Sequence, residues 1–339
     1  KHDVQPSRPD FAVVGVFNPG VIQIEDETIM LLRVAERPRD TSSEYVLSPI
    51  YDIQRKEIVI RRFGTESTDY DFSDARVIRT PQQSHLTSIS HLRLARSRDG
   101  ISFQVAERPF LAPSTEYEAY GVEDPRITSL DDLHYITYSA SSSLGTVTGM
   151  ALSSDFTTVS RMGVAFPPDN KDVVLFPQRV GGKYMALHRP SCSLYGKPDM
   201  WIAESPDLSC WGNHRRLAQT RSGYWDEGRI GAGATPILTD RGWLEIYHGA
   251  SNDHKYALGI MLLNTERPWE VMARSEQPLL IPEAGYEKRG FFNDVVFTCG
   301  CVQTGETLIV YYGAADECVA FFTVELADIW EHLKNSTEH

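Results

Sequence analysis

The sequence predicts an all-β protein, a five-bladed β-propeller with a short C-terminal helix. One pattern of two apolar strands around a turn occurs five times, starting at Asn18, Asp124, Phe176, Gly233 and Asn293. A further strand with a Ser- and Asp-bearing turn follows most copies, as in LRLARSRDGISF, TGMALSSDFTTV and MWIAESPDLSCW. Strand-rich self-similarity with a period of about 50 residues is typical of propellers. Such a fold directs the first residues of each inner strand toward one central funnel, so polar groups far apart in sequence would meet in one pocket.

The length and composition fit one radial array. The chain has 339 residues, of which 41% are hydrophobic and 23% charged, as in soluble globular proteins. A repeat array of this size is a single cooperative unit, so we expect residues 1–339 to form one propeller domain. The net charge of −13 argues against a nucleic-acid partner, because a phosphate backbone requires a basic face. Walker and dinucleotide-binding loops, a G-x-S-x-G elbow and an H-E-x-x-H motif are absent from the sequence.

The N-terminal segment and the cysteines give no sign of export or of a membrane. No apolar run approaches the length of a membrane span, and the polar start KHDVQPSRPD lacks the apolar segment of a signal peptide. A signal peptide that was removed stays compatible with the sequence, because the chain does not begin with Met. The cysteines are odd in number and their spacing fits no zinc site: Cys192, Cys210, Cys299, Cys301 and Cys318. We therefore expect a cytoplasmic protein without a metal centre.

The chain follows the repeat except in its first copy. We expect residues 1–17 to lead into the fold, and two strands between Val21 and Glu36 that are joined at Glu25–Glu27. The first two copies lie about twice as far apart as the others, which indicates an insertion in the first blade over about 37–83. The insertion holds the strand-like pieces EYVLSPIYD and KEIVIRRF and the acidic loop ESTDYDFSD. One helix is expected, the C-terminal ELADIWEHLKN, whose apolar residues recur at helical spacing: Leu326, Ile329, Trp330 and Leu333.

The segment GVEDPRIT places Asp124 at the start of the second copy. Because the residue before a proline is held extended, we expect Asp124 at the mouth of an inner strand, on the propeller axis. A carboxyl group there suits general-acid catalysis, with a pKa raised by neighbouring acids and by burial. The alternative is structural, with Asp124 capping a turn or pairing with Arg126. The convergence of five copies on one funnel favours the catalytic role.

Four cationic or protonatable residues stand near strand ends in the third and fourth copies: Lys171, Arg189, Arg229 and His248. In an acidic protein, such groups at equivalent positions of neighbouring blades indicate an anion site, and Arg and Lys suit phosphate. The alternative is a set of salt bridges to nearby carboxylates, namely Asp172, Asp226 and Glu227. Spacing alone does not decide between the two interpretations.

A third set of polar residues also falls at strand mouths: Asn18, Arg33, Glu36, Ser90, His91, Asp294 and Asp316. These residue types suit sugar hydroxyls, which need paired donors and acceptors. Aromatic residues that could stack on a sugar ring lie near them: Tyr120, Trp225, Tyr247, Tyr256, Phe291 and Phe292. We expect most of these rings to pack between blades instead, and retain Tyr120 among the candidate substrate contacts.

Glu227 has two interpretations. An inverting hydrolase needs a second carboxylate to activate water, about 6.5–9.5 Å from the acid. Glu227, beside Trp225 and Arg229, is the candidate for that role. Alternatively, its charge neutralises Arg229 or Lys171. The sequence leaves both interpretations open.

Several motifs together resemble a known family. GVEDPRIT, KDVVLFP, KYMALHRP, RIGAG, GWLEIYHG and YYGAAD occur in this order. They are similar to the pattern of glycoside hydrolase family 130, which comprises β-mannoside phosphorylases and β-1,2-mannosidases. The similarity extends from about Phe17 to Asp328, nearly the whole chain.

The resemblance implies a five-bladed propeller, in agreement with the repeat count, and a general acid at Asp124. In the phosphorylases of the family the acid acts through the mannosyl 3-hydroxyl, which relays the proton to the glycosidic oxygen. Inorganic phosphate then attacks the anomeric carbon with inversion and gives α-mannose 1-phosphate. The resemblance implies neither a metal nor an organic cofactor, with inorganic phosphate as the co-substrate.

The phosphate-binding positions of the family fall on Lys171, Asp172, Arg189, Arg229 and His248. The chain departs from the best-known pattern, which often has Arg-Asn at Lys171-Asp172 and Lys at Arg229. Asp172, which we also count among the substrate-binding candidates, should weaken anion binding unless its carboxylate turns away. Glu227 stands where phosphorylases are expected to carry a small or amide residue. These departures keep a hydrolase open.

We expect an inverting phosphorylase of β-1,2-linked mannosides, since VVGVFNPGV and LLRVAERP are closer to the β-1,2 branch of the family than to the mannosyl-glucose branch. One alternative is an inverting β-1,2-mannosidase with Glu227 as its base. Another is a carbohydrate-binding propeller without catalysis. The expected partners are a mannoside oligosaccharide and phosphate, with neither nucleic acid nor membrane, and the oligomeric state stays open.

Overall fold

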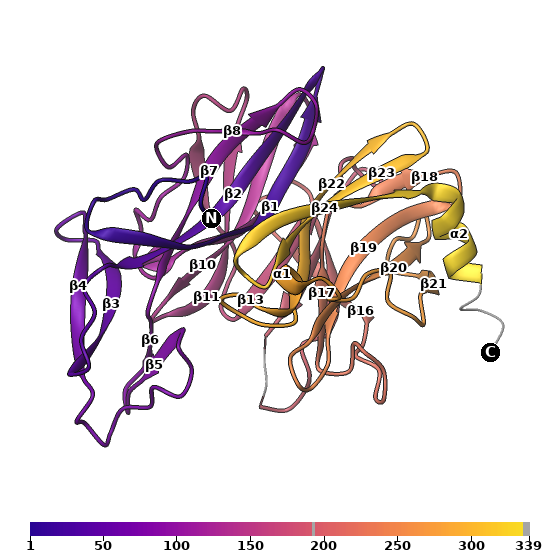
Figure 1. Cartoon of the computed structure of the whole chain (residues 1–339). Helices are drawn as coiled ribbons and strands as arrows, with labels where there is room; N and C mark the ends of the chain where they lie inside the picture. Colours follow the sequence, from indigo (N-terminus) through magenta and orange to yellow (C-terminus); the bar gives the residue numbers. More distant parts are fainter. Residues whose placement is uncertain (192–193, 335–339) are drawn as a thin grey trace.

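The computed structural model describes residues 1–191 and 194–334, and strands dominate it (Figure 1). Helical turns in this part are the 3-10 turn η1 (Glu116–Glu118), the short α1 (Gly285–Lys288) and the C-terminal α2 (Leu326–Lys334). The expected all-β class and the expected C-terminal helix are therefore confirmed. Cys192 lies outside the described residues.

The strands fall into five successive antiparallel groups along the chain. The first group contains β1 (Phe11–Ile24), β2 (Glu27–Pro38), β7 (Ile89–Ser97) and β8 (Gln104–Val105). The second contains β9 (Gly121–Leu130), β10 (Leu133–Ser142), β11 (Gly145–Ser153) and β12 (Ser160–Phe166). The third contains β13 (Asn170–Leu175), β14 (Tyr184–Pro190), β15 (Met200–Ser205) and β16 (Gly212–Ala218).

The last two groups complete the chain. The fourth contains β17 (Arg229–Ala232), β18 (Ile237–Thr239), β19 (Gly242–Ala250), β20 (Tyr256–Leu263) and β21 (Val271–Arg274). The fifth contains β22 (Val296–Thr304), β23 (Thr307–Ala314) and β24 (Cys318–Glu325). A single parallel pair between Ser90 and Gly121 joins the first two groups into one sheet. The first strands also meet: β1 contacts β9 and β22, and β13 contacts β9 and β17.

The insertion lies between β2 and β7, as the sequence predicts, and forms two small antiparallel sheets. These are β3 (Tyr45–Asp52) with β4 (Glu57–Gly64), and β5 (Val77–Arg79) with β6 (Ser84–Leu86). Figure 1 shows them at one side of the molecule, away from α2. The expectation that residues 1–17 only lead into the fold is wrong. β1 begins at Phe11, which pairs with Pro38, so the hydrogen-bonded ladder already includes part of that segment.

The Ser/Asp turns have the structural role that their repetition indicates. The Ser97 hydroxyl accepts a hydrogen bond from the Gly100 amide, and Ser205 does the same for Leu208. Asp99 and Asp207 then accept hydrogen bonds from amides in the following turns. Side chains of this kind satisfy backbone groups at a tight turn. These serines and aspartates are therefore parts of turns.

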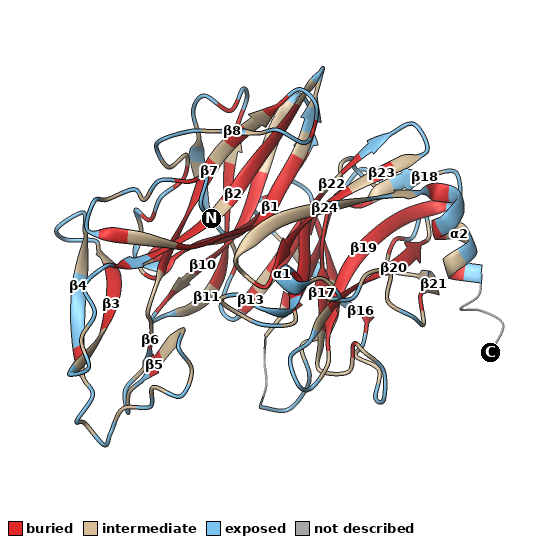
Figure 2. Cartoon of the chain, viewed as in Figure 1, coloured by how far each residue is buried: buried red, intermediate tan, exposed pale blue. Residues whose placement is uncertain are grey.

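The apolar core lies between neighbouring groups of strands. One cluster joins Met185 and Ile202 of the third group to Trp243 and Tyr247 of the fourth. Another joins the fourth and fifth groups and includes Ile329 of α2. Figure 2 shows burial running along β1, β2 and β19, whereas β4 in the insertion is largely exposed. Because apolar faces are buried between groups, the polar starts of the first strands are left to line a common cavity.

Candidate active site

A cavity of about 360 Å³ lies where the first strands of the groups come together, and the insertion supplies part of its wall. Its charged lining comes from segments far apart in sequence: Arg33, Arg76, Glu123, Asp124, Lys171, Arg229 and Asp316. Much of the remaining lining consists of Asn18 and five aromatic rings: Phe17, Tyr256, Phe291, Phe292 and Phe297. The expected meeting of sequence-distant polar groups in one pocket is thus confirmed.

A repeated backbone irregularity directs side chains toward this cavity. Asn18, Asp124 and Asp172 each stand at a register shift of a first strand and have φ angles of 48°, 48° and 54°. Asn and Asp tolerate this left-handed conformation better than most residues, and a β-bulge re-aims the side chain that it carries. The expectation of an extended Asp124 before Pro125 is wrong, because the bulge overrides the usual preference of the residue before a proline.

The Asp124 carboxylate is buried, with 3% of the residue exposed. Its Oδ1 accepts hydrogen bonds from Asn18 Nδ2 and Arg33 Nη1, each 2.9 Å long. Burial favours the neutral acid, but the positive charges of Arg33, Lys171 and Arg126 outweigh burial and hold the pKa of Asp124 below its ordinary value. The expectation of a raised pKa is therefore wrong. The neighbouring cations, which the sequence could not place, decide the direction.

Two further carboxyl groups share the cavity. Glu123 Oε1 lies 2.9 Å from Arg33 Nη2, so one guanidinium holds two acids. Among the described residues, Asp316 has no ion-pair partner: burial raises the pKa of Asp316 to about 6, with Arg33 opposing and the negative charge of Asp124 adding to the rise. Asp316 therefore keeps its proton to a higher pH than an ordinary aspartate does.

Lys171 and Arg229 carry the uncompensated positive charge of the cavity. Among the described residues, neither has a carboxylate oxygen within 4.0 Å. Arg229 Nη1 donates to the Tyr256 hydroxyl at 3.2 Å, while its buried Nε has no partner in the described chain. A lysine and an arginine without a counter-ion at the wall of a cavity are suited to an anion.

Arg189 and His248 contribute differently from what the sequence predicts. Both lie against Asp172 Oδ2, with Arg189 Nη1 at 3.1 Å and His248 Nε2 at 3.2 Å, and the described lining of the cavity includes neither residue. Burial lowers the pKa of His248 to about 4, so its ring is neutral at neutral pH. The salt-bridge interpretation holds for Arg189. Asp172, whose pKa is well below its usual value despite burial because Arg189 and His248 face it, is compensated and adds no free negative charge.

The family model for glycoside hydrolase family 130, described as β-1,4-mannooligosaccharide phosphorylase, matches residues 74–335. The chain belongs to glycoside hydrolase family 130. It is 44% identical to a β-1,2-mannobiose phosphorylase of Listeria innocua over 98% of this chain and 95% of that protein. It is 38% identical to a 1,2-β-oligomannan phosphorylase of a Thermoanaerobacter species, over 74% of this chain and 83% of the relative.

A solved structure extends this similarity to three dimensions. The Listeria innocua β-1,2-mannobiose phosphorylase, in complex with β-1,2-mannobiose, superposes with a TM-score of 0.96 at 43% identity. The match covers 98% of this chain and 96% of that one. The bulged first strands and the charged cavity described above therefore lie within the region that this member of family 130 shares.

Other candidates lie away from the cavity of this family 130 chain. Ser90 accepts a hydrogen bond from Arg33 Nε at 3.1 Å and orients that side chain from behind. His91 accepts one from Arg93 Nε at 3.1 Å, and burial lowers the pKa of His91 to about 3. Glu36 lies in the same buried cluster, 3.6 Å from Arg93. The structure therefore does not favour direct contacts between a sugar and Ser90, His91 or Glu36.

Tyr120 and Asp294 are also displaced from the expected site. Tyr120 packs against the ring of His85, at 6.0 Å between centroids, and faces a different pocket near the insertion. The main-chain oxygen of Asp294 accepts a hydrogen bond from the Tyr256 amide, and the described lining does not include Asp294. Trp225 stacks on Tyr247 at 5.5 Å, as expected of rings that pack in the core.

Glu227 is held within its own loop. Its Oε2 accepts a hydrogen bond from the Gly223 amide at 3.1 Å, and its main-chain oxygen accepts one from Lys197 Nζ at 2.5 Å. The described residues show no ion pair between Glu227 and either Arg229 or Lys171, and Glu227 does not line the cavity in that part of the chain. These contacts support neither interpretation of Glu227, and its role as a base stays a prediction.

Sequence reasoning missed three residues of the site. Glu123 is part of the GVEDPRIT motif, and its position next to Asp124 could have indicated that it belongs to the site. Arg126 is 1% exposed and donates to the main-chain oxygens of Asp124, Ala232 and Gly233. Arg76 comes from the insertion, which is not part of the repeat, so the repeat cannot predict the position of this residue. No pattern in the sequence distinguishes it from the other arginines of that segment.

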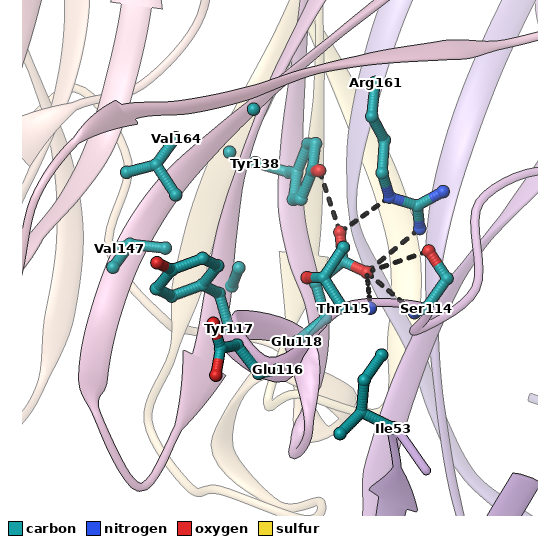
Figure 3. A pocket seen from close by; sticks show the side chains of 13 residues that line it. Ile53, Ser114, Thr115, Glu116, Tyr117, Glu118, Tyr138, Val147, Arg161 and Val164 are labelled. Atoms are coloured by element: carbon teal, nitrogen blue, oxygen red, sulfur yellow. Dashed lines mark hydrogen bonds and ion pairs between the residues drawn. The ribbon is translucent and has the colours of Figure 1, made fainter. Parts of the chain in front are cut away.

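A second cavity, of about 440 Å³, lies between the insertion and the second group of strands (Figure 3). Its buried carboxylate, Glu118, accepts hydrogen bonds from the Tyr138 hydroxyl at 2.9 Å, Arg161 Nε at 2.8 Å and the Ser114 amide at 2.8 Å. Both oxygens of Glu118 are fully used by the protein. This carboxylate joins two segments and leaves no acid free for chemistry.

Within residues 1–191 and 194–334, no helix has the length and hydropathy that a bilayer crossing requires. In the same residues, no group of three or more His, Cys, Asp or Glu side chains is arranged to hold a metal ion.

Proposed function

We propose that the chain is an inverting phosphorylase that cleaves β-1,2-linked mannosides with inorganic phosphate and releases α-mannose 1-phosphate. The observation that carries this proposal is the 44% identity to a β-1,2-mannobiose phosphorylase over nearly the full length of both chains. The cavity adds chemical support, because it sets a buried carboxyl group beside two cations that have no counter-ion in the described chain. A reaction between a glycoside and an anion needs both features.

In this proposal Asp124 is the general acid. It gives its proton to the mannosyl 3-hydroxyl, whose own proton passes to the glycosidic oxygen as the C1–O bond breaks. A phosphate oxygen forms the new bond to C1 from the opposite face. Because Asp124 is ionised in the free protein at neutral pH, it must gain a proton when ligands fill the cavity. Hydrogen phosphate loses a proton when its oxygen bonds to C1, and this proton balances the one that the glycosidic oxygen gains in each turnover.

Lys171 and Arg229 bind the phosphate in this proposal. Lys171 lies close enough to Asp124 to lower the pKa of that carboxyl, so the anion and the acid would flank one sugar ring. Arg189 and His248 act on the anion site indirectly, by fixing Asp172 behind it. This arrangement explains how a chain with a net charge of −13 can hold a phosphate: the local field differs from the overall charge.

The carboxylate that the sequence offers as the base of a hydrolase is not part of the cavity. Inversion with water needs a base about 6.5–9.5 Å from the acid, on the other face of the sugar. Glu227, the candidate from the sequence, is hydrogen-bonded within its own loop, and the described lining of the cavity does not include it. The carboxyl groups that share the cavity with Asp124 are Glu123, which pairs with Arg33, and Asp316. The cations Lys171 and Arg229 in the same cavity favour phosphate over water as the nucleophile.

We also infer that the five groups of strands are the five blades of a closed propeller that forms a single domain of residues 1–339. Contacts between first strands support this: β1 meets β9 and β22, β9 meets β13, β13 meets β17, and β22 meets β19 of the fourth group. The charged cavity stands where these strands meet.

Product analysis with β-1,2-mannobiose tests the proposed function. With phosphate we expect equal amounts of mannose and mannose 1-phosphate, and without phosphate no turnover. Asp124→Asn should lower kcat by about 100-fold or more, because an amide cannot donate the proton. Asp253→Asn, on an exposed carboxylate, is its control and should keep activity. Release of free mannose at an unchanged rate in the absence of phosphate would refute the phosphorylase.

The same assay tests the anion site. Lys171→Ala should raise the KM for phosphate by about tenfold or more, since a charge-assisted contact is lost. Lys183→Ala removes a lysine that pairs with Glu204 at the surface and should leave that KM unchanged. An unchanged KM for phosphate in Lys171→Ala would remove Lys171 from the site.

A further inference from the structure

Arg76 reaches the cavity from the insertion and is held in a fixed plane. Its Nε and Nη2 donate to the two carboxylate oxygens of Asp74, at 3.0 and 2.9 Å. Its guanidinium also stacks over the Phe292 ring, with 4.0 Å between the Cζ atom and the ring centroid. A bidentate pair and a stacking contact together restrict a side chain that is otherwise flexible. Arg76 is therefore pre-organised at the cavity wall.

One nitrogen of the Arg76 guanidinium makes no hydrogen bond within the described chain. Within the described chain, Nη1 of Arg76 has no hydrogen-bond partner, and the residue lines the same cavity as Asp124 and Lys171. Asp74 balances the positive charge of Arg76, whereas Lys171 and Arg229 have no such balance among the described residues. What Arg76 offers is thus two oriented N–H donors beside an aromatic ring. These groups suit the hydroxyls of a sugar better than a second anion.

The position of Arg76 indicates which sugar it would contact. The mannosyl unit that is transferred must touch both Asp124 and the phosphate, and those side chains all come from the bulged or first strands of the repeat. The segment between β2 and β7, which contains the insertion, supplies a separate part of the wall through Arg76, Val77, Leu86 and Ser88. A disaccharide cleaved at Asp124 places its second sugar on the side that the transferred unit does not occupy. Arg76 is the cation that this separate part of the wall offers to it.

We propose that Arg76, held by Asp74 and Phe292, is a specificity-determining residue that binds the hydroxyls of the second sugar, the unit that leaves in phosphorolysis and accepts mannose in the reverse reaction. This inference rests on the proposed function, because it assigns one side of the same cavity. The insertion then serves acceptor recognition. The two donors of Nη1 and the ring of Phe292 set the orientation of the acceptor.

The experiment compares Arg76→Ala with Arg62→Ala in the synthetic direction. Arg62 lies in the same insertion, is exposed and pairs with Asp40 at the surface, so it is a matched control. We expect Arg76→Ala to raise the KM for the acceptor mannose by about tenfold or more, the loss expected for a charged hydrogen-bond donor. The KM for mannose 1-phosphate should stay within about twofold, and Arg62→Ala should behave as wild type.

Two further variants separate contact from folding. Arg76→Lys keeps the charge but loses the bidentate pair, so it should not restore the acceptor KM. Phe292→Leu keeps an apolar side chain and should raise the same KM by a smaller factor. An unchanged acceptor KM in Arg76→Ala overturns the inference, as does an increase confined to the KM for mannose 1-phosphate. Equal losses for both substrates, with a lower melting temperature, also overturn it.

Equilibrium binding keeps this inference distinct from the proposed function. Calorimetric titration of β-1,2-mannobiose into wild type and Arg76→Ala needs no turnover. We expect the Kd of the disaccharide to rise by about tenfold in the variant. If wild type shows no phosphate-dependent turnover, the proposed function fails. If the disaccharide Kd is unchanged in Arg76→Ala, the inference on Arg76 fails, whatever the reaction is.

Discussion

Buried charges in this protein are arranged so that few stand alone. Arg33 holds Glu123 and Asp124, and Asp172 holds Arg189, with the neutral ring of His248 beside it. A buried ion is costly unless it is paired and hydrogen-bonded, so removing one partner should be harmful. Two half-buried cations differ from this pattern. Lys171 and Arg229 lack counter-ions in the described chain and line the cavity, where a ligand can supply one.

Glu245 is a second exception, and it lies in the core. Its Oε1 accepts a hydrogen bond from the Gly233 amide at 2.9 Å, and its buried Oε2 has no partner among the described residues. Burial raises the pKa of Glu245 to about 8, so the group keeps its proton at neutral pH. The protonated acid fixes the loop between β17 and β18, whose Gly233 oxygen also binds Arg126.

We predict that Glu245→Gln becomes more stabilising, relative to wild type, as the pH rises. Between about pH 4.5 and pH 8 the folded state keeps a proton that the unfolded state loses. The free energy of unfolding of wild type therefore falls with pH by up to about 1.4 kcal/mol per unit from this group. The glutamine variant has no such loss. Melting temperatures measured at about pH 5, 6.5 and 8 should diverge. Glu306→Gln, at an exposed site, is the control, and a pH-independent difference would contradict the prediction.

Among the elements, the bulged first strands matter most to the site. Asn18, Asp124 and Asp172 owe their orientation to one extra residue in each ladder. Close contact between these strands requires glycine at one point. A Cβ atom on Gly20 of β1 would lie 2.6 Å from the main-chain oxygen of Pro125 in β9. Gly20 therefore sets the distance between the strands that carry Asn18 and Asp124.

Gly20→Ala should damage both stability and activity. The added methyl must push β9 away, which we expect to cost about 1–3 kcal/mol of unfolding free energy. Because the shift falls next to Asp124, kcat/KM should drop by about tenfold or more. Gly212→Ala, where a Cβ would meet no atom within 4 Å, should leave both unchanged. Chemical denaturation and the mannobiose assay measure the two effects, and normal activity in a destabilised Gly20→Ala would show that the strand spacing does not position Asp124.

At the scale of the whole molecule, the site depends on all of the groups at once. The lining comes from the first, second, third, fourth and fifth groups and from the insertion. The apolar clusters bridge neighbouring groups, and α2 adds Leu326, Ile329 and Leu333 to the last of them. No single group buries its own faces, so none should be stable by itself.

We therefore predict one unfolding transition for the entire chain. Differential scanning calorimetry should give equal calorimetric and van't Hoff enthalpies. Mannose 1-phosphate at about 100 times its Kd should shift that transition as a whole, by about 2.7 kcal/mol of stability at the reference temperature. Two transitions, of which the ligand moves one, would mean that the groups form separate cooperative units.

The sequence by itself determined the all-β class, the strand pairs, the insertion, the C-terminal helix and most of the residues from which the candidate site is drawn. It indicated Asn18, Arg33, Asp124, Lys171, Arg229 and Asp316 because a repeat reveals which polar residues fall near strand ends, whereas Glu123, Arg76 and Arg126 were not indicated. The tertiary structure alone decided which residues of that set line the cavity and which stand behind it. It also decided the ionisation of Asp124. Repeat position says which end of a strand a residue occupies, but the bulges, the neighbouring cations and the packing of one group on the next determine where its side chain points and what charge it carries.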